Sequence, residues 1–74
     1  MQNQHSNQFT IEIEQEKDGR WIAEVLEIPG VSVYGETQQQ AIAHAQALSL
    51  RVLADKIEHG EMLLGLTSLT FTAA

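Results

Sequence analysis

The stretch TQQQAIAHAQALSLRVLADKIEHG, residues 37–60, decides the fold, because it predicts one long helix with both ends marked. At its start, the Thr37 hydroxyl can accept a backbone N–H as an N-cap, and Gln40 can complete a capping box. At its end, Gly60 suits the left-handed residue that follows many helices. His59, when protonated, suits the negative end of the helix dipole.

Apolar residues recur along this stretch at helical spacing and predict a buried stripe. They are Ala41, Ala45, Leu48 and Val52, flanked by Ile42 and Leu53. The opposite arc, which we expect to be solvated, carries His44, Arg51, Asp55 and Glu58. Because two alanines begin the stripe, the first turns are expected to lie close against a flat surface, most simply a β-sheet.

The residues before the helix predict a β-hairpin. Phe9 to Gln15 alternates apolar and polar residues, which is typical of a half-buried strand. Asp18-Gly19 is a strong hairpin signal, because glycine adopts positive φ at no steric cost. Trp21 to Leu26 is the expected second strand. Apolar residues occur on both of its faces, which favours an inner strand.

Three further segments complete the predicted order. Pro29-Gly30 marks a turn before a short third strand, Val31 to Tyr34. After the helix, residues 61–66 are expected to form a loop, and Ser68 to Thr72 a last strand with Leu69 and Phe71 facing inward. The sequence therefore predicts an α+β fold of order β-β-β-α-β, in which one long helix covers one face of a four-stranded mixed sheet. The right-handed crossover rule places the last strand parallel to one of the meander strands, most simply beside the first.

Composition limits the class of protein. The chain has 74 residues, no cysteine and a formal net charge of −6. We expect one domain over residues 9–74, with residues 1–8 as a flexible polar tail. The acidic balance disfavours autonomous nucleic-acid binding and is compatible with a basic protein partner. No stretch is apolar enough for a membrane span and no signal peptide is evident, so a cytoplasmic location is expected.

The carboxylates are the first place to look for catalysis. Glu12, Glu14 and Glu24 are expected to share the solvent face of the hairpin, where they could bind a divalent metal ion or divide acid and base roles. The alternative, which we prefer, is an ordinary solvated negative face. Neither His5 nor His44 has a second ligand at a recognised spacing, and no glycine cluster resembles a phosphate loop. No catalytic residue, metal or cofactor is expected.

Apolar groups outside the predicted core indicate a binding surface. A helix on one face of the sheet leaves Ile22, Leu26 and Tyr34 without cover, and such patches usually mark partner surfaces. On the helix, Leu50 and Ile57 lie to one side of the main stripe. They either pack under the loop of residues 61–66 or remain exposed. Because small domains often oligomerise, a homodimer formed through Ile22, Leu26, Leu50 and Ile57 is expected.

Several segments in this order resemble the HicB-type antitoxin domain. They are FTIEIE (residues 9–14), DGRWIAEV (18–25), EIPGV (27–31), GET (35–37) with Ala41 after it, and LADKIEHGE (53–61). The resemblance extends over residues 9–71 and implies a partial ribonuclease-H-like fold of β-β-β-α-β order. At the third helical position, where the family typically has an acidic residue, this sequence has Gln40.

The resemblance also implies a function. HicB-type domains neutralise HicA, a small basic toxin that cleaves messenger RNA, by docking against it. Full-length members add a DNA-binding module, and direct DNA binding is not expected here because none follows the fourth strand. The hypothesis is thus a non-catalytic antitoxin whose partner contacts are the carboxylates and two aromatic anchors, Glu12, Glu14, Glu24, Glu27, Glu36, Trp21 and Tyr34. The alternative is a stand-alone oligomeric module of the same family without a toxin partner.

Overall fold

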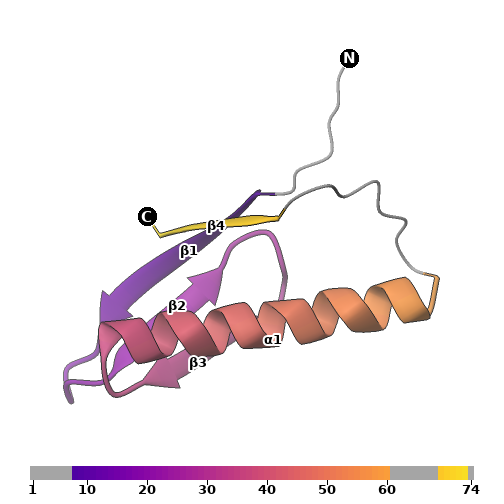
Figure 1. The fold of residues 1–74 in the computed structure, drawn as a ribbon. Helices are drawn as coiled ribbons and strands as arrows, with labels where there is room; N and C mark the ends of the chain where they lie inside the picture. The colour runs from indigo at the N-terminus through magenta and orange to yellow at the C-terminus, as the bar shows by residue number, and fades with distance from the viewer. Residues whose placement is uncertain (1–7, 61–68, 74) are drawn as a thin grey trace.

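In a computed structural model of the chain, which describes residues 8–60 and 69–73, the elements follow the order β-β-β-α-β (Figure 1). Their bounds are β1 Gln8–Gln15, β2 Trp21–Val25, β3 Ser32–Gly35, α1 Gln38–Glu58 and β4 Thr70–Ala73. The helix lies along one face of the sheet, so the predicted α+β arrangement is confirmed.

The sheet has the strand order β3-β2-β1-β4. Its first three strands form an antiparallel meander, with Ile13 opposite Ala23 and Ala23 opposite Val33. β4 returns parallel to β1, as the crossover rule predicts. The rings of Phe9 and Phe71, which face each other across this parallel pair, have centroids 5.7 Å apart. Because β2 lies between β3 and β1, it is an inner strand, as its apolar residues on both faces indicate.

Both predicted helix ends are confirmed. The backbone N–H of Gln40 donates to the Thr37 hydroxyl at 3.0 Å, so Thr37 is the N-cap. The Gln40 side chain accepts from the backbone N–H of Glu36 at 2.6 Å, one residue before the N-cap that a standard capping box would use. At the other end, Gly60 has a φ of 71°, the left-handed conformation that ends many helices and that glycine adopts because it has no Cβ.

The buried stripe of α1 differs from the predicted one. Ala41, Ala45, Ser49 and Leu53 are buried, whereas Leu48 and Val52 are half-buried at its margin. Ser49 was not expected in the core. Its hydroxyl donates to the Ala45 carbonyl oxygen at 2.7 Å, so the one buried hydroxyl among the described residues is satisfied within the helix.

The strand bounds also differ by one or two residues. β1 begins at Gln8, which was assigned to the tail, and β2 ends at Val25, before Leu26. Val31 belongs to the turn rather than to β3, because its N–H donates to the Ile28 carbonyl at 3.2 Å. Ile28 and Val31 are nevertheless core residues, only 3% and 1% exposed. The tail at residues 1–7, the loop at 61–66 and the predicted start of the last strand at residue 68 lie outside the described residues.

The junction of β3 and α1 depends on Gly35. A Cβ built on this buried glycine would lie 2.7 Å from the Cα of Ala41 and 2.9 Å from the backbone carbon of Gln40. Because Gly35 and Ala41 are both small, the first turn of the helix can approach the edge of the sheet, as the alanine pattern predicts. Among the described residues, α1 is too polar to qualify as a membrane-crossing helix.

Candidate partner-binding surface

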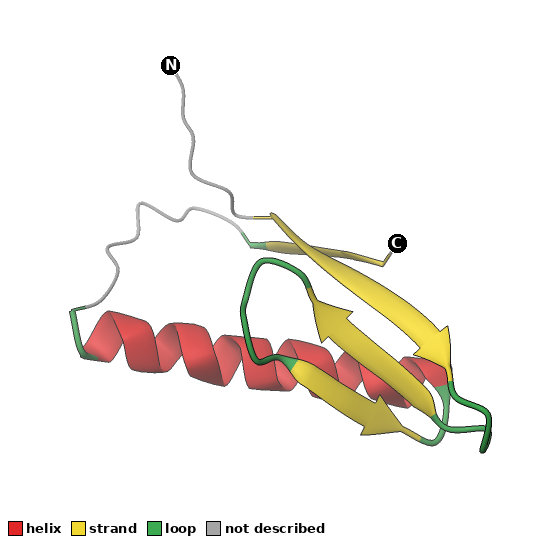
Figure 2. Cartoon of the chain, turned by 180° about the vertical axis from the view of Figure 1, so that it is seen from behind, coloured by secondary structure: helices red, strands yellow, loops and turns green. Residues whose placement is uncertain are grey.

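The face of the sheet turned away from α1 carries a row of glutamates. Figure 2 shows this face in front of the helix. Alternation along β1 and β2 places Glu12, Glu14 and Glu24 on it, and all three are exposed. Glu12 lies directly opposite Glu24 in the antiparallel ladder. The predicted shared face is therefore observed.

This arrangement is electrostatically unfavourable in the isolated chain. Like charges directly opposite each other on neighbouring strands destabilise a sheet. None of the three carboxylates forms an ion pair with another residue within 8–60 or 69–73. A cationic group brought to this face by a partner would remove the repulsion between Glu12 and Glu24. The face is thus suited to a basic surface.

One end of the same face carries an aliphatic and an aromatic side chain beside a glutamate. Glu14, Ile22 and Tyr34 are neighbours across β1, β2 and β3. Ile22 is half-buried and Tyr34 is 44% exposed. The guanidinium of Arg20 lies 4.3 Å from the centroid of the Tyr34 ring, a cation–π distance. The Tyr34 ring therefore contacts Arg20 and is still partly exposed to solvent, where a partner could contact it.

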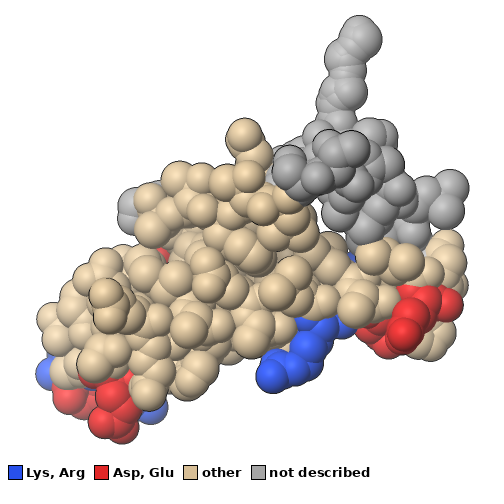
Figure 3. All heavy atoms as spheres, in the orientation of Figure 1, with Lys and Arg blue, Asp and Glu red and all other residues tan. Residues whose placement is uncertain are grey.

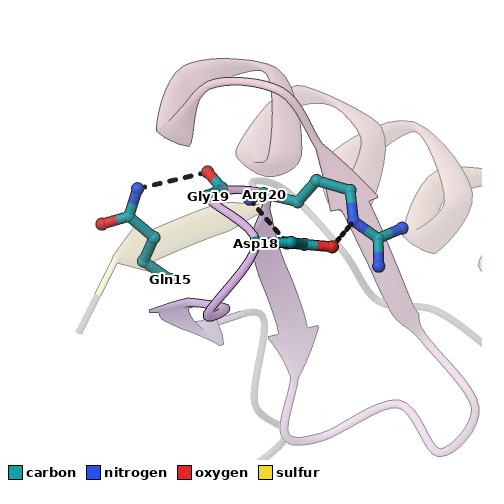
Figure 4. A network of polar contacts seen from close by, with 4 residues as sticks. All are labelled: Gln15, Asp18, Gly19 and Arg20. Carbon is teal, nitrogen blue, oxygen red and sulfur yellow. Dashed lines mark hydrogen bonds and ion pairs between the residues drawn. The ribbon is translucent and has the colours of Figure 1, made fainter.

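The position of Arg20 is set by the β1–β2 turn (Figure 4). Asp18 accepts from the backbone N–H of Arg20 at 3.0 Å and from its Nε at 2.8 Å, and the Gln15 side chain donates to the Gly19 carbonyl at 3.2 Å. The backbone bond from Arg20 is the main reason why the pKa of Asp18 is lowered. Arg20 was not singled out from the sequence. Its position directly after Asp18-Gly19 was the available signal.

The other two predicted carboxylates lie at opposite ends of the sheet. Glu27, in the turn after β2, accepts from the backbone N–H of Thr10 at 2.7 Å. This hydrogen bond is the main cause of the lowered pKa of Glu27. Glu36 lies between β3 and α1 and is exposed. Glu27 borders the row of Glu12 and Glu24, whereas Glu36 is separate from it.

Trp21 lies on the other side of the sheet. It alternates with Ile22, shares the helix side with Ala23 and Val25, and packs half-buried against the core. The two predicted aromatic anchors, Trp21 and Tyr34, therefore do not belong to one surface.

The residues expected to mediate self-association are similarly divided. Leu26, Leu50 and Ile57 are 49%, 50% and 44% exposed, and Ile22 is half-buried. Ile22 lies on the outer face of the sheet, Leu26 in the turn after β2, and Leu50 and Ile57 on the helix. Figure 3, in the orientation that has α1 in front, shows a surface that is largely uncharged, with acidic atoms gathered near both ends. The alternative that the loop at 61–66 covers Leu50 and Ile57 lies outside the described residues.

The described side chains include no group of three His, Asp or Glu residues close enough together to hold a metal ion. The alternative that Glu12, Glu14 and Glu24 bind a divalent metal ion thus has no supporting geometry in this part of the chain. Comparisons with family models, curated proteins and solved structures found no match for this chain.

Proposed function

We propose that this chain is a non-catalytic, HicB-like antitoxin-type protein that binds and neutralises a small basic RNA-cleaving toxin of HicA type. The observation that carries the proposal is the facing pair Glu12 and Glu24 on the outer side of the sheet. Both side chains are exposed, and they repel each other in the isolated chain. A cationic group of a basic partner placed between the two carboxylates would be attracted by both and would offset this repulsion.

Two further features support the proposal. The element order and the single helix on one face agree with the fold that the HicB resemblance implies. The formal charge of −6 favours long-range attraction to a basic protein, which speeds and orients the encounter. In this proposal Glu12, Glu14 and Glu24 supply the charge, Glu27 extends it, and Tyr34 is the aromatic anchor beside them.

Co-production with the small basic protein encoded beside this chain's gene tests the proposal. We expect the two to co-purify and the chain to relieve the growth arrest and RNA cleavage caused by its partner. The double variant Glu12→Gln, Glu24→Gln should weaken binding about tenfold or more and flatten its salt dependence. The double variant Asp55→Asn, Glu58→Gln, which removes the same number of charges from α1, is the matched control and should leave binding nearly unchanged. Absence of a basic neighbour, or equal binding by both variants, would contradict the proposal.

A second candidate is a stand-alone oligomeric module of the same family without a toxin partner. The observation that favours it is the exposure of Leu50 and Ile57 seven residues apart on α1. Sedimentation at tens of micromolar chain should then show a dimer that Leu50→Ser dissociates. A monomer at that concentration argues against this candidate and leaves the antitoxin proposal in place.

A further inference from the structure

In the part of the chain that the structure describes, β3 is an edge strand, and one of its sides has no neighbouring strand. The N–H of Val25 donates to the Val31 carbonyl at 3.0 Å, and the antiparallel register continues through Ala23 opposite Val33. Hydrogen-bonded and non-hydrogen-bonded pairs alternate in such a ladder. Val33 therefore bonds to β2, while the backbone groups of Ser32 and Tyr34 point away from the sheet.

One of these outward groups is already occupied. Nδ1 of His44, on α1, lies 3.0 Å from the Tyr34 carbonyl oxygen. Because a carbonyl only accepts, Nδ1 carries the hydrogen. Within residues 8–60 and 69–73, the Ser32 carbonyl and the Tyr34 N–H have no hydrogen-bond partner. These two groups flank Val33, and in a parallel ladder a single incoming residue uses one of each: its N–H donates to the first and its carbonyl accepts from the second.

A groove lies beside this edge on the helix side. It has a volume of about 240 Å³ and is lined by Val33, His44, Ala47, Leu48 and Arg51. This volume is below the range of about 300–1,000 Å³ for whole-ligand pockets, and it suits one side chain. The floor is apolar, and Arg51 is exposed at its rim without an ion pair to another described residue.

We propose that the β3 edge binds an extended peptide segment of a partner protein, which runs parallel to β3 and places one acidic side chain in this groove. Paired strand residues point their side chains to the same side of a sheet, so the residue opposite Val33 faces the groove. Its aliphatic stem packs on Val33 and Leu48, and its carboxylate pairs with the Arg51 guanidinium. This is β-strand addition with an acidic specificity pocket.

A second copy of this chain fits the edge poorly. Antiparallel pairing of two β3 strands about Val33 would use the Tyr34 carbonyl, which His44 occupies. It would also bring two Arg51 side chains toward the same junction, and like charges oppose such pairing. The central residue of the proposed segment uses only the Ser32 carbonyl and the Tyr34 N–H, and it leaves the Tyr34 carbonyl to His44. The proposal is independent of the glutamates on the outer face of the sheet, so the two can fail separately.

The test uses the full chain labelled with ¹⁵N and a blocked five-residue peptide, valine-threonine-glutamate-threonine-valine. Titration to a few millimolar covers the weak affinity expected of so short a strand. We expect saturable shifts confined to residues 32–34 and to the helix turns around His44 and Arg51, with slower hydrogen exchange of the Tyr34 amide. Arg51→Gln should weaken binding about tenfold. Lys17→Gln, a matched control at an exposed position in the β1–β2 turn, should not change it.

Three peptide controls separate the parts of the site. A central glutamine or lysine should bind at least about fivefold more weakly, because the Arg51 pair is lost or becomes repulsive. Methylation of the central backbone nitrogen should abolish binding, since Ser32 then has no donor. Equal binding by the three side chains, shifts centred on β4, or no shifts at all would overturn the proposal. So would a concentration-dependent dimer through β3, which would identify a second copy as the occupant.

Discussion

The repulsion between Glu12 and Glu24 has a measurable effect on stability. In a hydrogen-bonded antiparallel pair the two Cα atoms lie about 5.5 Å apart, and extended carboxylates can separate to about 7 Å. At that separation, two charges in water repel by about 0.6 kcal/mol. Glu24→Gln should therefore raise the free energy of unfolding of the isolated chain by about 0.5 kcal/mol, or Tm by about 2–4 °C.

Urea unfolding followed by Trp21 fluorescence measures this effect, because Trp21 is the one tryptophan and packs against the core. The gain should shrink in 1 M salt, where the Debye length falls to about 3 Å. Glu14→Gln is the matched control, since Glu14 lies opposite the uncharged Ile22. Equal gains for the two variants, or a gain for Glu24→Gln that ignores salt, would refute the reasoning.

Three other predictions concern packing, capping and pH. Gly35→Ala should destabilise the chain by about 1–3 kcal/mol, because its Cβ would overlap the backbone at Ala41; an unchanged urea midpoint would contradict the close approach. Gly60→Val should cost about 1 kcal/mol or more at a φ of 71°, and equal stability would show that no left-handed residue is needed there. Glu27 has a lowered folded pKa, so its contribution is present above its unfolded value near 4.5 and is lost as pH falls through the folded pKa. The stability difference between wild type and Glu27→Gln should accordingly narrow below pH 4.5, as urea titrations at several pH values would show; a constant difference would exclude the Thr10 bond as its source.

The helix was predictable because its signals are local. Thr37 and Gly60 act through hydrogen bonds and φ values that depend on immediate neighbours. The buried stripe was less predictable, because burial depends on the angle at which the helix meets the sheet. Ser49 was missed since a polar residue rarely marks a core position, although its hydroxyl donates to the Ala45 carbonyl and is therefore satisfied.

The outer face of the sheet was predicted in part. Alternation identified the shared face of Glu12, Glu14 and Glu24, but the sequence did not reveal the register that sets Glu12 against Glu24. That register depends on the turn around Asp18 and Gly19 and on which residues face the core. The groove beside β3 was not predicted, because it joins a strand edge to helix residues that are distant in sequence. His44 was expected to be merely solvated, whereas its ring reaches the Tyr34 carbonyl.

The parallel pairing of β4 with β1 has a consequence for how the protein is made. β1 leaves the ribosome before β4, so its flank stays open until residues 70–73 have been synthesised and have come back beside it. Until then the nascent chain offers Phe9 and its neighbours to any other strand nearby, which is a recognised route to misassembly. Chaperone binding to newborn chains should therefore concentrate on the opening segment and fall away once the closing one arrives.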